Sequence, residues 1–172
     1  DRDLLMAITG TKKGIAVFSD ILGKTPEQDS VLETSEYKAK AILSIQDHGE
    51  VRGFNYSAKQ DLLAVACYKK ITETSSEGAI LLFEKASTLL KGDTQTITPT
   101  RVITGALTGL KRPMDVAIDN RAGGKYLYVA DSEAKRVSRF LFSESGNIVP
   151  DHFKDYTLTP VSISLDSRGP GE

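Results

Sequence analysis

The sequence contains no tryptophan, one cysteine and two histidines among its 172 residues. A single cysteine excludes a disulfide framework within the chain. The formal net charge is −1, so no excess of either sign draws the chain to nucleic acid or to an anionic membrane. No apolar run approaches the roughly 20 residues that a membrane-spanning helix needs.

Motifs that carry chemistry are also missing. There is no G-x-S-x-G sequence, and His48 and His152 stand in separate segments without a serine or cysteine nucleophile pattern beside them. The stretch ITGALTGL has two glycines but no following Lys-Ser/Thr and no helix pattern, so it is not a phosphate loop. Cys67 ends an apolar run, which favours a buried structural thiol over a reactive one. We predict no catalytic residue and no tightly bound cofactor.

Residues 101–150 read as a unit of four short strands. Apolar and polar residues alternate at 115–119, and YLYVA at 126–130 is rich in aromatic and β-branched residues. The turn NRAGGK separates these two strands. VSRFLF at 137–142 predicts a third strand, and RVIT at 101–104 predicts an outer strand.

The same pattern recurs along the chain. Equivalent second strands begin at residues 5, 63 and 127, which are 58 and 64 positions apart, and each is followed by an equivalent third strand. A preceding first strand recurs at 54–57, 116–119 and 163–166. A period of roughly 40 to 60 residues with four short strands is typical of a β-propeller blade.

We therefore predict an all-β, propeller-like domain of four-stranded antiparallel blades, with about two full blades and two partial ones. A ring of about six or seven blades would contain it. A blade buries its sheet faces only against neighbouring blades, so an incomplete set leaves some faces open. We keep three alternatives: the chain is part of a longer propeller, it closes a ring with another chain, or it folds as a small compact barrel or sandwich. The predicted units are a partial blade at 1–20, blades at 38–85 and 100–150, and the start of a further blade at 151–172.

Finer expectations accompany these units. An outer strand is expected at 38–45 and another at 151–156, with a turn of helix at 85–92 and a first strand at 160–166. Three aspartates recur at the predicted strand ends, and we expect their carboxylates to accept hydrogen bonds from turn N–H groups. They are Asp119, Asp131 and Asp166.

Two stretches carry a family resemblance. RPMDVAID at 112–119 and KYLYVADSEAKRVSRF at 125–140 resemble the NHL-type propeller blade, with its proline, its "YVAD" strand and its polar turn before an arginine. RVITGALTGL and SGNIVP resemble a repeat of bacterial secreted propellers. The middle unit departs from the pattern, since Cys67 replaces the aspartate and Val51-Arg52-Gly53 replaces the proline. The resemblance implies a secreted, periplasmic or cell-envelope protein.

Propeller ligands usually sit over the central channel, which the loops entering the innermost strands face. Six residues at such positions are our candidates for ligand binding: Asp47, His48, Arg52, Asn55, Arg112 and Asp115. We predict a non-catalytic scaffold that binds an unknown protein or small molecule, and that assembles with itself or with further blades.

A metal-dependent hydrolase of the gluconolactonase type is the alternative that the resemblance implies. Such propellers hold a divalent cation through oxygen ligands around the axis. Only Asp47, Asn55 and Asp115 stand near such positions here. The hydrolase requires at least three acidic or amide side chains that converge on one axial point.

Overall fold

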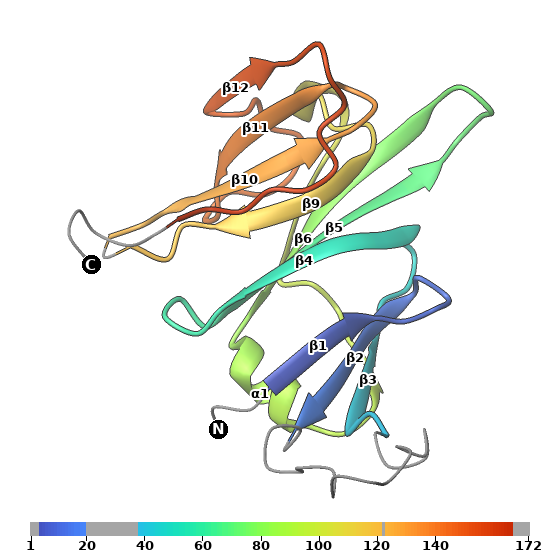
Figure 1. Cartoon of the computed structure of the whole chain (residues 1–172), viewed down its shortest axis with the longest axis vertical. Helices are drawn as coiled ribbons and strands as arrows, with labels where there is room; N and C mark the ends of the chain where they lie inside the picture. The colour runs from blue at the N-terminus through green and yellow to red at the C-terminus, as the bar shows by residue number, and fades with distance from the viewer. Residues whose placement is uncertain (1–3, 20–37, 122, 167–172) are drawn as a thin grey trace, which may run out of the picture.

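Three four-stranded sheets form the fold that the computed structural model describes for residues 4–19, 38–121 and 123–166 (Figure 1). The first sheet contains, in order, β1 (Leu4–Ile8), β2 (Gly14–Ser19), β3 (Ala41–Ser44) and β7 (Gln95–Thr96). The second contains β4 (Glu50–Ser57), β5 (Leu62–Lys70), β6 (Ser76–Glu84) and β8 (Arg101–Thr104). The third contains β9 (Pro113–Ile118), β10 (Tyr126–Asp131), β11 (Arg136–Leu141) and β12 (His152–Asp155).

The neighbouring strands are antiparallel except for β3 and β7, which are parallel. Helix α1 (Ala86–Lys91) and the 3₁₀ turn η1 (Ala106–Thr108) flank β7 and β8. No helix in the described ranges is long and apolar enough to cross a membrane. The chain is therefore all-β, with propeller-like four-stranded blades, as the sequence predicts.

The predicted hairpins are confirmed in register. Leu63 pairs with Phe83 in the second sheet, and Leu127 pairs with Phe140 in the third. The helical turn expected at 85–92 is α1, and the outer strand expected at 151–156 is β12. These features were predictable because they depend on local turn residues and on the period of the sequence.

Strand partners differ from the predicted units. β3 pairs with β2 in the first sheet, and β8 pairs with β6 in the second, so neither belongs to the unit that follows it in sequence. Each of the last two sheets begins at its inner strand, β4 or β9. The segment 160–166 forms no strand. Parts of the predicted partial blade and of the last unit lie outside the described residues (1–3, 20–37, 122 and 167–172).

The second sheet is the middle layer, and β5 is buried on both of its faces. Its alternate residues Leu63, Val65 and Cys67 face a core shared with the first sheet. Residues Leu62 and Ala64 face a core shared with the third sheet. A strand covered on both sides has no polar face, which explains the continuous apolar run LLAVAC.

The inner strands β4 and β9 touch at equivalent positions of the repeat. The N–H of Ile118 donates to Oδ1 of Asn55 at 3.2 Å. A Cβ on Gly53 would lie 2.6 Å from the carbonyl oxygen of Met114 and 2.7 Å from Cα of Asp115. Only glycine permits this approach, because any side chain would have to displace backbone atoms.

Cys67 is fully buried, and its Sγ donates to the carbonyl of Ala79 at 3.6 Å. Burial raises the pKa of the thiol to about 12, so about one molecule in ten thousand carries the thiolate at pH 8. We expect the Cys67 thiol of the native protein not to react with a chromogenic disulfide reagent at pH 8. In urea-unfolded protein the same thiol should react fully. In a Ser145→Cys variant the added thiol stands at an exposed position. This variant should release one equivalent of chromophore per chain at once. Comparable release from the native wild type would contradict the burial of Cys67.

Candidate functional site

The loop that enters β9 is held by a buried carboxylate. Asp131 is 0 % exposed, and it accepts hydrogen bonds from the N–H groups of Lys111 at 2.7 Å and Arg112 at 3.0 Å. It also accepts from Glu133 at 3.1 Å and Ala134 at 2.9 Å. One side chain therefore joins the loop before β9 to the turn after β10. These hydrogen bonds fix the position of the Arg112 backbone.

Asp119 plays a comparable local part at the end of β9. It accepts from the backbone N–H of Arg121 at 3.1 Å and from two nitrogens of the same guanidinium at 2.9 and 2.8 Å. The side-chain hydrogen bond from Arg121 lowers the pKa of Asp119 below its ordinary value. The predicted role of these strand-end aspartates in holding turns is confirmed for Asp119 and Asp131.

Two predicted site residues meet over one aromatic ring. The guanidinium carbon of Arg112 lies 4.9 Å from the centroid of the Tyr68 ring, and that of Arg52 lies 5.9 Å from it. Tyr68 is 8 % exposed and ends the buried part of β5. A cation held over an aromatic face is attracted by the ring quadrupole. We call Glu50, Arg52, Tyr68 and Arg112 the arginine–tyrosine cluster.

Glu50 balances one of the two arginines. Its Oε2 accepts from Lys12 Nζ at 3.2 Å, Arg52 at 3.4 Å and the Tyr68 hydroxyl at 3.5 Å. The hydrogen bond from Lys12, with the nearby positive charges, lowers the pKa of Glu50. No carboxylate of the described chain forms an ion pair with Arg112. The Arg112 guanidinium is thus held in place, and no carboxylate of the residues that the structure describes neutralises it.

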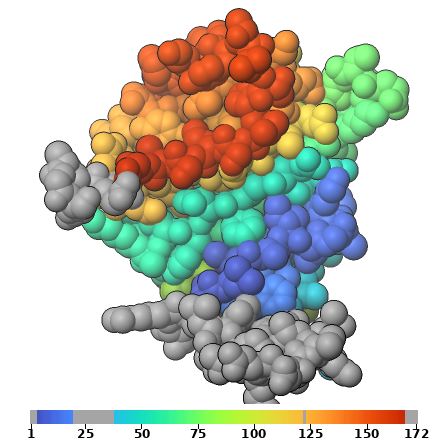
Figure 2. Space-filling model, viewed as in Figure 1, coloured from blue at the N-terminus to red at the C-terminus, as the bar shows by residue number. Residues whose placement is uncertain are grey.

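Open hollows lie on both sides of Arg112. One measures about 440 Å³ and the other about 340 Å³, which is within the range of about 300–1,000 Å³ typical of ligand sites. The first is bounded by the β5–β6 hairpin, whose tip projects from the body of the protein (Figures 1 and 2). Its lining includes Lys70 and Ser76, and that of the second includes Thr159. Glu133 lines both.

The other predicted site residues lie elsewhere. Asp47 is exposed, has a φ of 67° and lines a separate hollow with Lys13, and His48 is half-buried beside it in the same loop. Asn55 holds β9 through its amide oxygen. Asp115 accepts from Val116 N at 2.9 Å within its own strand. The structure thus brings together Arg52 and Arg112 from the six predicted residues.

Metal binding was the alternative use of these positions. No three His, Cys, Asp or Glu side chains among the described residues gather where they would hold a metal ion. Asp47 lines a different hollow from Arg112, while Asn55 and Asp115 are engaged by backbone N–H groups. No observation in the described residues favours the hydrolase, which stays an untested prediction.

Tyr68 and Glu50 were not predicted as site residues from the sequence. Glu50 begins β4, Tyr68 lies near the end of β5, and the two pair directly in the β4–β5 ladder. Their joint position opposite Arg112 depends on how the second sheet packs on the third. A local signal for Tyr68 exists, because it is an aromatic residue that closes an apolar run just before a long polar insertion.

No protein-family model matches this chain, and the search of curated proteins returned no match. The NHL-type resemblance therefore remains a prediction.

Proposed function

We propose that this protein is a non-catalytic binding scaffold whose arginine–tyrosine cluster binds a carboxylate side chain of an acidic protein segment. The observation that carries the proposal is the guanidinium of Arg112, which lies over Tyr68 without a carboxylate partner in the described chain. The resemblance to bacterial secreted propellers supports a secreted or envelope location for such a scaffold.

The chemistry of the cluster favours a carboxylate. Guanidinium is a planar fork of N–H donors that matches a carboxylate in a bidentate manner. The ring of Tyr68, and the hydrogen bond that the Arg112 backbone N–H donates to Asp131, restrict where this fork can lie. A donor that is already positioned loses less conformational freedom on binding.

The shape of the surroundings favours an extended segment. The two hollows continue on either side of Arg112 between the β5–β6 hairpin and residues 159–161. Lys70 adds a second cation, although Glu73 pairs with it at 2.8 Å. An acidic peptide laid across both hollows would place one carboxylate at Arg112 and its flanking residues in each hollow.

The test is fluorescence anisotropy with a fluorescein-labelled, N-acetylated hexaglutamate peptide at low ionic strength. We expect Arg112→Ala to weaken binding about ten-fold, which corresponds to about 1.4 kcal/mol, and Arg112→Lys to weaken it less. Arg101→Ala is the matched control, because Arg101 lies on the outer strand β8 and forms an ion pair with Glu84 of β6. Its affinity should equal that of the wild type.

Two outcomes would contradict the proposal. One is saturable binding that Arg112→Ala leaves unchanged, which would place the acidic segment elsewhere. The other is no binding by the wild type at a salt concentration low enough for surface charges to act.

A further inference from the structure

Among the described residues, the first sheet has no counterpart of the inner strand that begins the other two. By the repeat, β1 is equivalent to β5 and β10, which pair with the inner strands β4 and β9. Within the described residues β1 pairs with β2 alone. The N–H of Thr9 donates to the carbonyl of Gly14, and the alternation of an antiparallel ladder then directs the backbone groups of Leu4, Met6 and Ile8 to the other edge.

The burial of side chains on β4 points to the same position, beside β1, as the place for a further strand. Val116 and Ile118 of β9 are 1 % and 2 % exposed, because the second sheet with its inner strand covers them. Their equivalents on β4, Phe54 and Tyr56, are only partly buried against the first core. The difference follows from the first sheet, which presents no inner strand there among the described residues.

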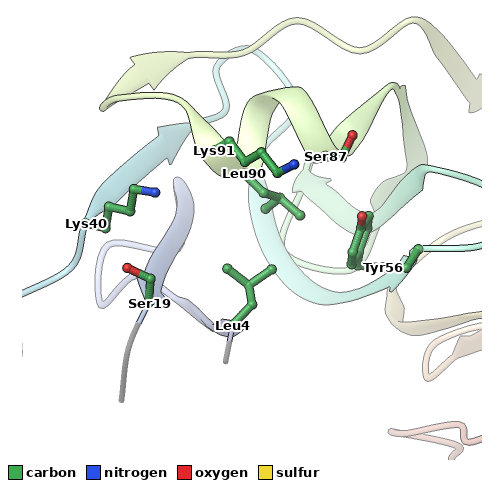
Figure 3. Close-up of a pocket in the computed structure, with 8 residues that line it drawn as sticks. Leu4, Ser19, Lys40, Tyr56, Ser87, Leu90 and Lys91 are labelled. Carbon is green, nitrogen blue, oxygen red and sulfur yellow. The ribbon is translucent and has the colours of Figure 1, made fainter. Parts of the chain in front are cut away.

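A hollow of about 140 Å³ lies at one end of this edge. Leu4 and Tyr56 line it from opposite sides, with Leu90 of α1 between them (Figure 3). The walls of this hollow are mostly apolar. The edge of β1 therefore combines apolar side chains with backbone groups that pair with no strand of the described residues. Such an edge is a template for another strand.

Residues 161–166 show the burial alternation of a strand, although the structure assigns them to no sheet. Ile163 and Leu165 are half-buried while their neighbours are exposed, which is the alternation of a strand lying on one face. Asp115 of β9 accepts from Ser162 Oγ at 2.8 Å and from Ile163 N at 3.0 Å. Figure 1 shows this segment running alongside β9. It therefore lies against β9 as β9 lies against β4, at equivalent positions of the repeat.

We propose that residues 161–166 of one copy of this chain pair antiparallel with β1 of a second copy. The pairings of Phe54 with Val65 and of Tyr56 with Leu63 set the register by equivalence. Ile163 then lies opposite Ala7, and Leu165 lies opposite Leu5. Two such exchanges give each first sheet an inner strand and join six sheets, three from each chain, into one ring.

Two features of the described residues match each other and favour a second copy as the occupant. In ranges 4–19, 38–121 and 123–166, the outer edge of β1 pairs with no strand, residues 161–165 belong to no sheet, and the two share the same repeat register. The N–H of Ile163 points to Asp115, so the N–H of Ser164 points the opposite way, toward an incoming edge strand. Ser162 and Ser164 occupy the positions of Gly53 and Asn55, which are the residues that meet the next inner strand. This inference does not depend on the acidic-segment site.

The mass in solution and a disulfide cross-link test the exchange. Light scattering should give twice the 18.7 kDa of one chain. In the double variant Leu5→Cys with Leu165→Cys, the two Cα atoms should stand about 4.5 Å apart as a non-hydrogen-bonded pair, which a disulfide can bridge. Mild oxidation should then yield a covalent dimer on a non-reducing gel. The control, Leu5→Cys with Ser164→Cys, moves the second thiol to the opposite face and should not link.

A proline variant tests the backbone pairing separately. Ser164→Pro removes the N–H that faces β1 and should shift the protein to monomer at a concentration where Ser164→Ala remains dimeric. A monomeric wild type with a cooperative melt would overturn the proposal. A dimer in which the Leu5→Cys and Leu165→Cys thiols stay free would overturn it as well. A series of oligomers larger than the dimer would also overturn it.

Discussion

Replacing Asp131 with alanine is expected to lower the free energy of unfolding by roughly 4 kcal/mol. Four backbone N–H groups donate to this buried carboxylate, and hydrogen bonds to a charged acceptor contribute about 1.5–3 kcal/mol each. The contributions do not add fully, because the donors share one partner. Urea unfolding followed by circular dichroism measures the loss.

Two variants make the Asp131 result specific. Asp151→Ala removes a carboxylate that pairs with Arg139 at the surface, and we expect a loss below about 1 kcal/mol. Asp131→Asn keeps the shape and one acceptor oxygen, so its loss should fall between those of the two alanine variants. If Asp131→Ala were no worse than Asp151→Ala, the turn network would not hold the loop as described.

Replacing Phe83 with alanine is expected to lower the free energy of unfolding by about 3–5 kcal/mol. Its side chain is 0 % exposed in the core between the first and second sheets. The loss combines the transfer of the ring from water with a cavity that flanking strands cannot close, because β6 is hydrogen-bonded on both sides. The measurement is again the midpoint and slope of a urea transition.

Phe153→Ala is the matched control for this core. Phe153 lies on the edge strand β12 and is 45 % exposed, with the Arg136 guanidinium 4.0 Å from its ring centroid. We expect a loss of about 1 kcal/mol or less, which is the usual strength of an exposed cation–π contact. Equal losses for the two variants would mean that the first core is not sealed from water.

The turns and hairpins of this protein were predictable because their causes are local. The repeated Leu-x-Val/Ala strands and the Gly-Gly turn before Tyr126 predict hairpins from neighbouring residues alone. Asp119 and Asp131 likewise bond to groups within their own turns or to the loop beside them. The burial of Cys67 followed from the apolar run around it.

Strand partnership was less predictable, and so was the site. The pattern of RVIT indicates a strand, but whether it pairs with β6 or opens the next unit depends on contacts distant in sequence. Arg112 was a candidate from its place before β9, whereas its position over Tyr68 requires the packing of two sheets. Asp115 was a ligand-binding candidate and stays one, and its hydrogen bond from Ser162 Oγ could not be read from the sequence, because the two residues are distant along the chain.

By itself, the sequence determined the all-β class, the hairpins and the turn-holding roles of Asp119 and Asp131. These depend on dihedral preferences and on a period of two, which act over a few residues. The tertiary structure decided which strands share a sheet, which apolar faces form the two cores, and that Arg112 has no carboxylate partner in the described part of the chain. Those outcomes depend on burial between layers, and the free energy of burial does not depend on distance along the chain.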